Sequence, residues 1–255
     1  MRALTFFFAT VFALAAQGAI KNELIEYKDG DLVLEGYIAY DDASTEKRPG
    51  VLIVHSWTGV NKQSKATADE LAKLGYVGFA LDMYGKGVYL ADPKDSAAKS
   101  GEMKANVPVL RQRALAGLEV LRKFRLTDPG KLAAIGYCFG GTTALEIARS
   151  GEPIQGVVSF HGALGTKTPE DAKNIKCKVL ALHGAIDPAV PAEEVAAFEK
   201  EMRDANVNWE LVSYGGAVHS FTDPDANRPP VSLYHEQSAK RSWIRMQQFF
   251  DEIFE

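Results

Sequence analysis

The chain has 255 residues, of which 46% are hydrophobic and 24% are charged, and its formal net charge is −4. This length and hydrophobic content suffice for one large α/β domain with a full core. The negative net charge provides no basic field, which argues against nucleic acid as a partner.

The N-terminus has the pattern of an export signal. Met1-Arg2 precedes an apolar stretch from Ala3 to Ala16, and small residues follow directly. We therefore predict a secretory signal peptide over residues 1–19 and a single domain over residues 20–255, secreted or exported to a bacterial periplasm. The apolar run is short for a membrane span, so we expect no stable membrane insertion after the signal is removed. A buried N-terminal helix is the alternative interpretation.

Most of the remaining chain alternates between strand and helix patterns. Residues 24–28 and 31–40 alternate in hydrophobicity around a Lys-Asp-Gly turn, which predicts a β-hairpin. Residues 50–56 form a continuous apolar run, typical of a strand buried in a parallel sheet. Residues 84–107 are polar and predict a long loop or small excursion of the kind that builds pockets. We expect the other strands at 76–83, 132–137, 155–160, 178–183 and 208–214, and helices at 63–74, 108–125, 139–149, 191–204 and 233–254.

This alternation predicts an α/β fold with a mostly parallel central sheet, helices on both faces and an N-terminal β-hairpin. In such sheets, functional residues lie at the carboxyl ends of the strands. A candidate site should therefore consist of residues that directly follow strands.

Cys138 is the first residue to meet this expectation. It follows the strand 132–137 within the motif "GYCFGG", at the start of a predicted helix. The spacing Gly136-x-Cys138-x-Gly140 is that of the G-x-S-x-G nucleophile elbow with cysteine in place of serine. Side chains at the two glycine positions would collide with the adjoining strand and helix. The helix N-terminus favours a thiolate and then an oxyanion, so Cys138 is a candidate nucleophile.

An acid and a base for this nucleophile follow later strands in the chain order that the topology requires. Asp187 comes after the strand 178–183, within "HGAIDPAVP", and His219 comes after the strand 208–214. His219 would withdraw the thiol proton and later protonate the leaving group, while Asp187 would fix the histidine tautomer.

The remaining histidines are weaker candidates for catalysis. We expect His55 and His183 to be structural, His161 to line the pocket, and His235 to be a surface residue. Asp82 also ends a strand, but it precedes Cys138 and is therefore out of order for the acid.

Backbone N–H groups would form the oxyanion hole. We predict the N–H groups of Trp57, in the loop after the strand 50–56, and of Phe139, directly after the nucleophile. Trp57 could instead be a buried loop anchor, a role compatible with the same N–H.

Together these residues resemble the dienelactone hydrolase family of α/β-hydrolases. The resemblance extends from about Val51 to the C-terminus, through "HSWTG", "GYVGFALDMYG", "GYCFGG", "HGAIDPAVP" and "HSFTDP". It implies the α/β-hydrolase fold, a triad of Cys138, Asp187 and His219, and no metal or organic cofactor.

The chain departs from the family pattern where substrate would bind. Ser56 stands in place of a glutamate in the oxyanion loop, and Lys86 in place of an arginine. Asp223 or one of its neighbours stands at the position of a second arginine of the family. One lysine cannot reproduce a bidentate arginine clamp, so we expect a neutral ester or lactone rather than a dienelactone. The predicted substrate-binding residues are Ser56, Trp57, Tyr84, Lys86, Tyr89, Phe139, His161 and Phe221.

The leading hypothesis is a cofactor-free hydrolase that forms a covalent thioester and acts on a small-molecule ester or lactone. A phosphotriester side activity is chemically conceivable. A non-catalytic binding or sensor protein and a redox-active thiol protein are the alternatives; no C-x-x-C motif supports the latter. We expect no disulfide between Cys138 and Cys177. The last helix has exposed faces that would support a homodimer.

Overall fold

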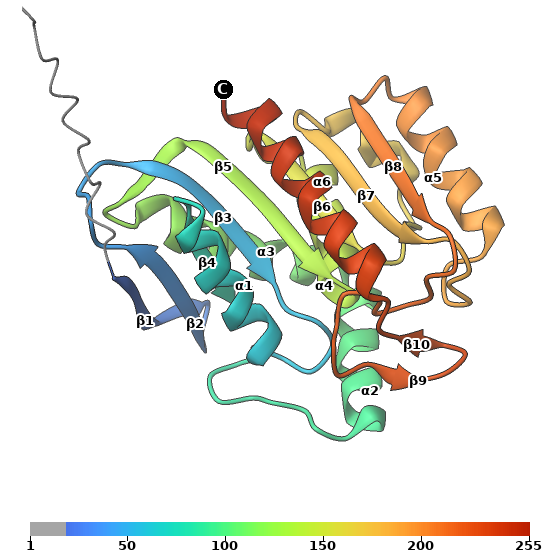
Figure 1. Cartoon of the computed structure of the whole chain (residues 1–255), viewed down its shortest axis with the longest axis horizontal. Helices are drawn as coiled ribbons and strands as arrows, with labels where there is room; N and C mark the ends of the chain where they lie inside the picture. Colours follow the sequence, from blue (N-terminus) through green and yellow to red (C-terminus); the bar gives the residue numbers. More distant parts are fainter. Residues whose placement is uncertain (1–18) are drawn as a thin grey trace, which may run out of the picture.

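An eight-stranded sheet organises residues 19–255, the part of the chain that the structure, a computed structural model, describes (Figure 1). The strand order is β1-β2-β4-β3-β5-β6-β7-β8. The strands are β1 (Ile20–Asp29), β2 (Leu32–Asp41), β3 (Arg48–Val54), β4 (Val77–Leu81), β5 (Thr127–Tyr137), β6 (Gly156–Phe160), β7 (Lys178–Gly184) and β8 (Trp209–Tyr214). The predicted signal peptide, apart from Ala19, lies outside the described residues.

The predicted mixed sheet with an N-terminal hairpin is confirmed. β1 pairs antiparallel with β2, and β2 pairs antiparallel with β4. From β4 to β8 all neighbouring strands are parallel. The carboxyl ends of these parallel strands therefore meet at one edge of the sheet. Among residues 19–255, none of the helices combines the length and apolar character needed to cross a bilayer.

Helices cover both faces of the sheet (Figure 1). Successive strand residues point to opposite faces, so Val51 and Ile53 pack on one side and Leu52 and Val54 on the other. The first side is covered by α1 and α6, and the second by α3, α4 and α5. The helices are α1 (Lys62–Lys73), α2 (Pro93–Ala105), α3 (Val107–Lys123), α4 (Phe139–Arg149), α5 (Ala192–Asp204), α6 (Glu236–Phe254) and the 3₁₀ helix η1 (Pro169–Asn174).

The prediction of a loop over 84–107 was wrong for its second half, which contains α2. Asp92 caps this helix by accepting a hydrogen bond from the Lys94 N–H, and Pro93 occupies its first turn. Only Ser96, Ser100 and Met103 of this helix are buried. The helix therefore lacks the apolar periodicity on which its prediction would depend.

The region after His219 also differs from expectation. A small hairpin of β9 (Asn227–Arg228) and β10 (Ser232–Leu233) precedes α6, which begins three residues later than predicted. His235 is partly buried and caps α6, because its Nδ1 accepts a hydrogen bond from the Ser238 N–H. His235 is therefore a helix cap rather than a surface residue without a structural role.

A buried ion network joins the end of α4 to α5. Arg149 is fully buried and forms two 2.8 Å hydrogen bonds to the Glu201 carboxylate, one to Glu146 and one to the Leu164 carbonyl. Arg111 of α3 binds the other oxygen of Glu146. The network fixes the helix that begins at the candidate nucleophile against two neighbouring elements.

Replacing Glu201 with alanine should destabilise the fold strongly, because it leaves the Arg149 charge buried without its bidentate partner. We expect the free energy of unfolding to fall by about 3–5 kcal/mol in a denaturant titration. Glu199→Ala in the same helix removes a partly exposed ion pair with Arg203. This variant should change the free energy of unfolding by about 0.5 kcal/mol or less. Equal losses of unfolding free energy in the two variants would contradict the stabilising role of the buried Arg149–Glu201 ion pair.

Candidate active site

Cys138 occupies a strained turn between β5 and α4. Its backbone has φ 55° and ψ −114°, a conformation that non-glycine residues rarely adopt. A Cβ at Gly136 would lie 2.0 Å from the Gly140 carbonyl oxygen, and one at Gly140 would lie 2.2 Å from the Val54 carbonyl oxygen. Both glycines are therefore required by close backbone approach, as the sequence predicts.

The structure brings the three predicted triad residues into one chain of contacts. The His219 Nε2 lies 2.9 Å from the Cys138 Sγ, and the His219 Nδ1 lies 2.8 Å from Asp187 Oδ2. Asp187 is buried in the loop after β7 and also accepts a hydrogen bond from the Ala189 N–H. All three residues follow parallel strands, at the predicted edge of the sheet.

These contacts shift two pKa values in opposite directions. Burial raises the pKa of the Cys138 thiol, but the hydrogen bond and positive charge of His219 and the Phe139 N–H outweigh it, so the net pKa is lowered. Burial lowers the pKa of the His219 imidazolium, but Asp187 and the Cys138 sulfur raise it to about 10. Between the lowered thiol pKa and about pH 10, a thiolate–imidazolium pair is therefore the favoured state.

A small pocket of about 110 Å³ surrounds the Cys138 sulfur. We call it the Cys138 pocket; its lining residues are Ser56, Trp57, Gln63, Cys138, His161, His219, Ser220, Asp223 and Arg228. Ser56, Trp57 and His161 are thus where the sequence analysis expected them.

Three predicted pocket residues are not part of this lining: Phe139, which is 2% exposed and stacks on the His55 ring, and Tyr84 and Phe221, which lie behind it. The Tyr84 hydroxyl donates a hydrogen bond to the Trp57 carbonyl, and the fully buried Phe221 ring packs edge-on against the His161 ring. Tyr84 and Phe221 thus support lining residues rather than form the surface. Trp57 is held by Tyr84, and the Arg228 guanidinium lies 5.0 Å from the centre of its ring, so Trp57 also anchors its loop.

Lys86 and Tyr89 lie outside the Cys138 pocket. The Lys86 ammonium is exposed and forms ion pairs with Glu26 and Glu35 of the N-terminal hairpin. Tyr89 is 61% exposed and lines a separate shallow depression beside α1. The assignment of Lys86 to substrate binding therefore has no support in the structure, because its charge is engaged at the hairpin.

Sequence reasoning missed three residues of the Cys138 pocket, Gln63, Ser220 and Arg228. Gln63 comes from the first turn of α1, and Arg228 from the β9–β10 hairpin, which folds back over the site. An isolated β-bridge between His219 and Ser232 fixes that hairpin beside the histidine. A cationic side chain is therefore present at the pocket, contributed from a position that no motif indicates.

His55, Asp82 and His183 do not line the Cys138 pocket. The Nδ1 of the buried His55 lies 2.5 Å from the Ser56 carbonyl oxygen, and its Nε2 accepts a hydrogen bond from the Met83 N–H. Asp82 accepts hydrogen bonds from the N–H groups of Tyr84 and Gly85. His183 is buried at the end of β7, outside the lining of the Cys138 pocket, and burial lowers its imidazole pKa.

Cys138 and Cys177 are both free thiols. Burial raises the pKa of Cys177 to about 12, whereas Cys138 is partly accessible with a lowered pKa. Within residues 19–255, no cluster of three or more His, Cys, Asp or Glu side chains is arranged to hold a metal ion.

Comparison with known proteins finds relatives that match most of the chain. The sequence model of the dienelactone hydrolase family matches residues 34–254. A crystal structure described as a dienelactone hydrolase-like promiscuous phosphotriesterase from metagenomic libraries is 36% identical, with a TM-score of 0.89 over 92% of this chain and 99% of that one. A solved structure named m3DLH is 38% identical, with the same coverage and TM-score. Protein usf of Aquifex pyrophilus is 29% identical over 91% of this chain and 98% of its own length.

The lowered thiol pKa predicts how Cys138 responds to alkylation. Below the ordinary thiol pKa most cysteines are protonated and unreactive, but a thiolate paired with His219 persists. We therefore expect the rate at which iodoacetamide labels Cys138, measured by peptide mass spectrometry, to fall much less steeply between pH 8 and pH 6 than the rate for a free thiol.

In His219→Gln, labelling of Cys138 should fall roughly tenfold per pH unit below the ordinary thiol pKa, because the stabilising cation is gone. Cys177→Ser is the matched control and should leave the labelling of Cys138 unchanged. An equally steep pH dependence in the wild type would refute the ion pair.

Proposed function

Since this chain belongs to the dienelactone hydrolase family and is a hydrolase of carboxylic esters or lactones, we propose that Cys138, His219 and Asp187 form its catalytic triad. The observation that carries this proposal is the 2.9 Å contact between the His219 Nε2 and the Cys138 Sγ, with Asp187 hydrogen-bonded to the opposite ring nitrogen. Nucleophile, base and orienting acid are thereby in hydrogen-bond reach of one another.

In the acylation step, the Cys138 thiolate attacks the carbonyl carbon of the ester. The carbon–oxygen double bond becomes a single bond to an oxyanion, which accepts hydrogen bonds from the backbone N–H groups of Trp57 and Phe139. When the intermediate collapses, the His219 Nε2 gives its proton to the departing alcohol oxygen, and a thioester on Cys138 remains.

Deacylation reverses the roles. Neutral His219 takes a proton from water, and the resulting hydroxide attacks the thioester carbonyl. The carbon–sulfur bond breaks, the acid leaves, and the thiolate–imidazolium pair forms again. Asp187 keeps the His219 ring in one orientation and tautomer through both steps. These steps use only this chain's side chains, its backbone and water.

The resting thiolate depends on His219 and on the start of α4. Ser56, at the position where the family has a glutamate, is engaged locally because its Oγ accepts a hydrogen bond from Asn61 Nδ2 at 3.1 Å. Asn61 is itself the cap of α1. No carboxylate at position 56 therefore competes with the imidazolium for the sulfur.

The alternative interpretation, a binding or sensor protein that retains the fold, is not favoured by these contacts. A binding protein has no need of a strained nucleophile turn beside an oriented imidazole. The family membership and the hydrolase names of its relatives point the same way.

Substitution of Cys138 tests the triad. We expect Cys138→Ala to lower kcat/KM for neutral aryl esters at least about 1000-fold, because both the nucleophile and its ion pair are lost. Asp187→Asn should lower it about 100-fold or more, since the histidine tautomer is no longer fixed. Cys177→Ala is the control and should retain wild-type kinetics. Turnover that survives in folded Cys138→Ala would exclude the thiol mechanism.

We also propose that neutral aryl phosphotriesters are slow substrates of the same site. The support is the 36% identical neighbour described as a promiscuous phosphotriesterase. A thiolate beside an oxyanion hole can attack phosphorus as well as carbon. The phosphotriesterase activity should disappear in Cys138→Ala together with the esterase activity. Phosphotriesterase activity that persists in this variant would indicate a second site.

Export remains a proposal that rests on the N-terminal sequence. When the full chain is expressed in a bacterial host, the protein should accumulate outside the cytoplasm, with a mature N-terminus near Ile20 by intact-mass measurement. Replacing Arg2 and interrupting the apolar run with Leu14→Asp should keep the protein in the cytoplasm, with residues 1–19 still attached. A mature protein that still carries residues 1–19 outside the cytoplasm would contradict cleavage.

A further inference from the structure

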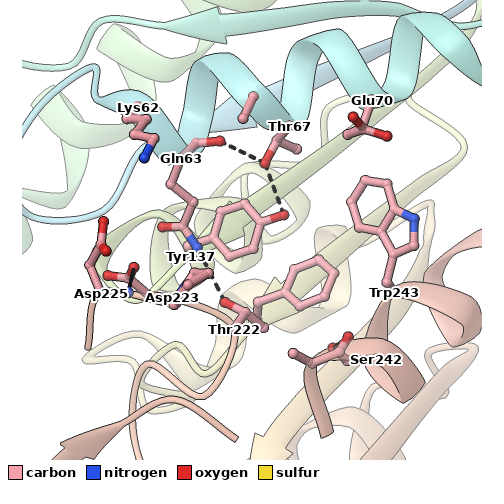
Figure 2. A pocket seen from close by; sticks show the side chains of 14 residues that line it. Lys62, Gln63, Thr67, Glu70, Tyr137, Thr222, Asp223, Asp225, Ser242 and Trp243 are labelled. Atoms are coloured by element: carbon pink, nitrogen blue, oxygen red, sulfur yellow. Dashed lines mark hydrogen bonds between the residues drawn. The ribbon is translucent and has the colours of Figure 1, made fainter. Parts of the chain in front are cut away.

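A second, larger cavity adjoins the Cys138 pocket on the α1 and α6 side of the sheet (Figure 2). Its volume is about 320 Å³, compared with about 110 Å³ for the Cys138 pocket. A volume of this size is typical of small-molecule sites. We call it the side cavity; α1, the ends of β5 and β6, the loop after His219 and α6 form its walls.

The walls of the side cavity are mainly apolar and aromatic. Tyr137 and Phe160 stack with ring centres 4.8 Å apart. Trp243 of α6 also lines the cavity (Figure 2). The Tyr137 hydroxyl lies 3.3 Å from Thr67 Oγ1, which donates to the Gln63 carbonyl. The polar atoms of this wall are thus paired within the protein. Tyr137 and Phe160 are 4% and 1% exposed, so the partly buried Trp243 is the most accessible aromatic side chain of the cavity.

The side cavity and the Cys138 pocket share Gln63 and Asp223. Gln63 Nε2 donates a hydrogen bond to Thr222 Oγ1 at 3.3 Å, and the same oxygen lies 2.8 Å from His161 Nε2. Figure 2 shows the Gln63–Thr222 contact crossing from α1 to the loop. The hydrogen-bonded side chains of Gln63 and Thr222 therefore form the boundary between the side cavity and the Cys138 pocket.

The loop that follows His219 forms part of the wall of the side cavity. Thr222 and Asp223 follow His219 by three and four residues, and His219 delivers the proton to the departing oxygen in the proposed mechanism. The oxyanion donors Trp57 and Phe139 come from other elements and do not line the side cavity. A substrate with its carbonyl oxygen at those donors would therefore direct its alcohol portion toward Thr222 and Asp223.

We infer that the side cavity is the subsite for the alcohol portion of the substrate, and that this portion is an uncharged aromatic or bulky apolar group. The inference rests on the proposed function. Charge supports the exclusion of anions, because Glu70, Asp223 and Asp225 line the cavity against one ammonium, that of Lys62 (Figure 2). A carboxylate on the alcohol portion would be repelled by this excess of negative charge.

The test compares acetates of alcohols of similar acidity: ethyl, benzyl, naphthylmethyl and 4-carboxybenzyl acetate. We expect wild-type kcat/KM for naphthylmethyl acetate to exceed that for ethyl acetate at least tenfold, because the added rings leave water. The 4-carboxybenzyl ester should be slower than the benzyl ester, and Asp225→Asn should narrow that difference.

Two variants fill the cavity, Ala239→Phe in α6 and Ala66→Phe in α1, because both alanines line it. Each should reduce the naphthylmethyl-to-ethyl ratio of kcat/KM at least fivefold, through a loss of kcat/KM for the naphthylmethyl ester. Ala197→Phe, at an exposed position of α5, is the matched control and should keep the wild-type ratio. Thermal unfolding of each variant checks that the fold is intact.

An unchanged ratio in both filled variants would overturn the inference. A filled cavity that alters selectivity among ethyl esters of different acids would overturn it too, because the cavity would then hold the acyl portion. These outcomes are distinct from failure of the proposed function, which would appear as turnover of ethyl acetate by Cys138→Ala.

Discussion

The strained turn at Cys138 is the constraint on which the rest of the site depends. A side chain held at φ 55° between β5 and α4 projects from the edge of the sheet, and its position is set by backbone on both sides. The turn exists only because Gly136 and Gly140 allow the helix start to approach β5 and β3 within distances that a Cβ would prevent. The buried Arg149 network then fixes the far end of the same helix.

The electrostatics of the site follow from that placement. The turn directs the Cys138 sulfur at His219, whose other ring nitrogen is hydrogen-bonded to Asp187, so the thiol pKa falls while the imidazolium pKa rises to about 10. The neighbouring His161 is buried and repelled by the charge of His219, which holds its pKa well below the ordinary value. It therefore stays neutral, and its bond to Thr222 links the charged pair to the wall of the side cavity.

The parts of the site that could be predicted from the sequence are those encoded in short motifs at strand ends. Cys138, Asp187 and His219 were recognisable because the parallel topology requires each to follow a strand, in a fixed order. Gln63, Arg228 and the side cavity were not, because they depend on how α1, α6 and the β9–β10 hairpin pack over the loop after His219. The helix α2 was missed because its buried face contains two serines and one methionine. The position of Lys86 outside the Cys138 pocket could not be predicted, because its partners Glu26 and Glu35 lie in the β1–β2 hairpin, distant in the chain.

The central claim is that Cys138 becomes covalently acylated during turnover, and rapid quenching followed by mass spectrometry tests it most directly. Wild-type protein mixed with an aryl acetate should carry one acetyl group on the peptide that contains Cys138 within the first turnover. That group should disappear at a rate no slower than steady-state turnover. An unmodified Cys138 during full activity, or an adduct that decays more slowly than product forms, would contradict the account.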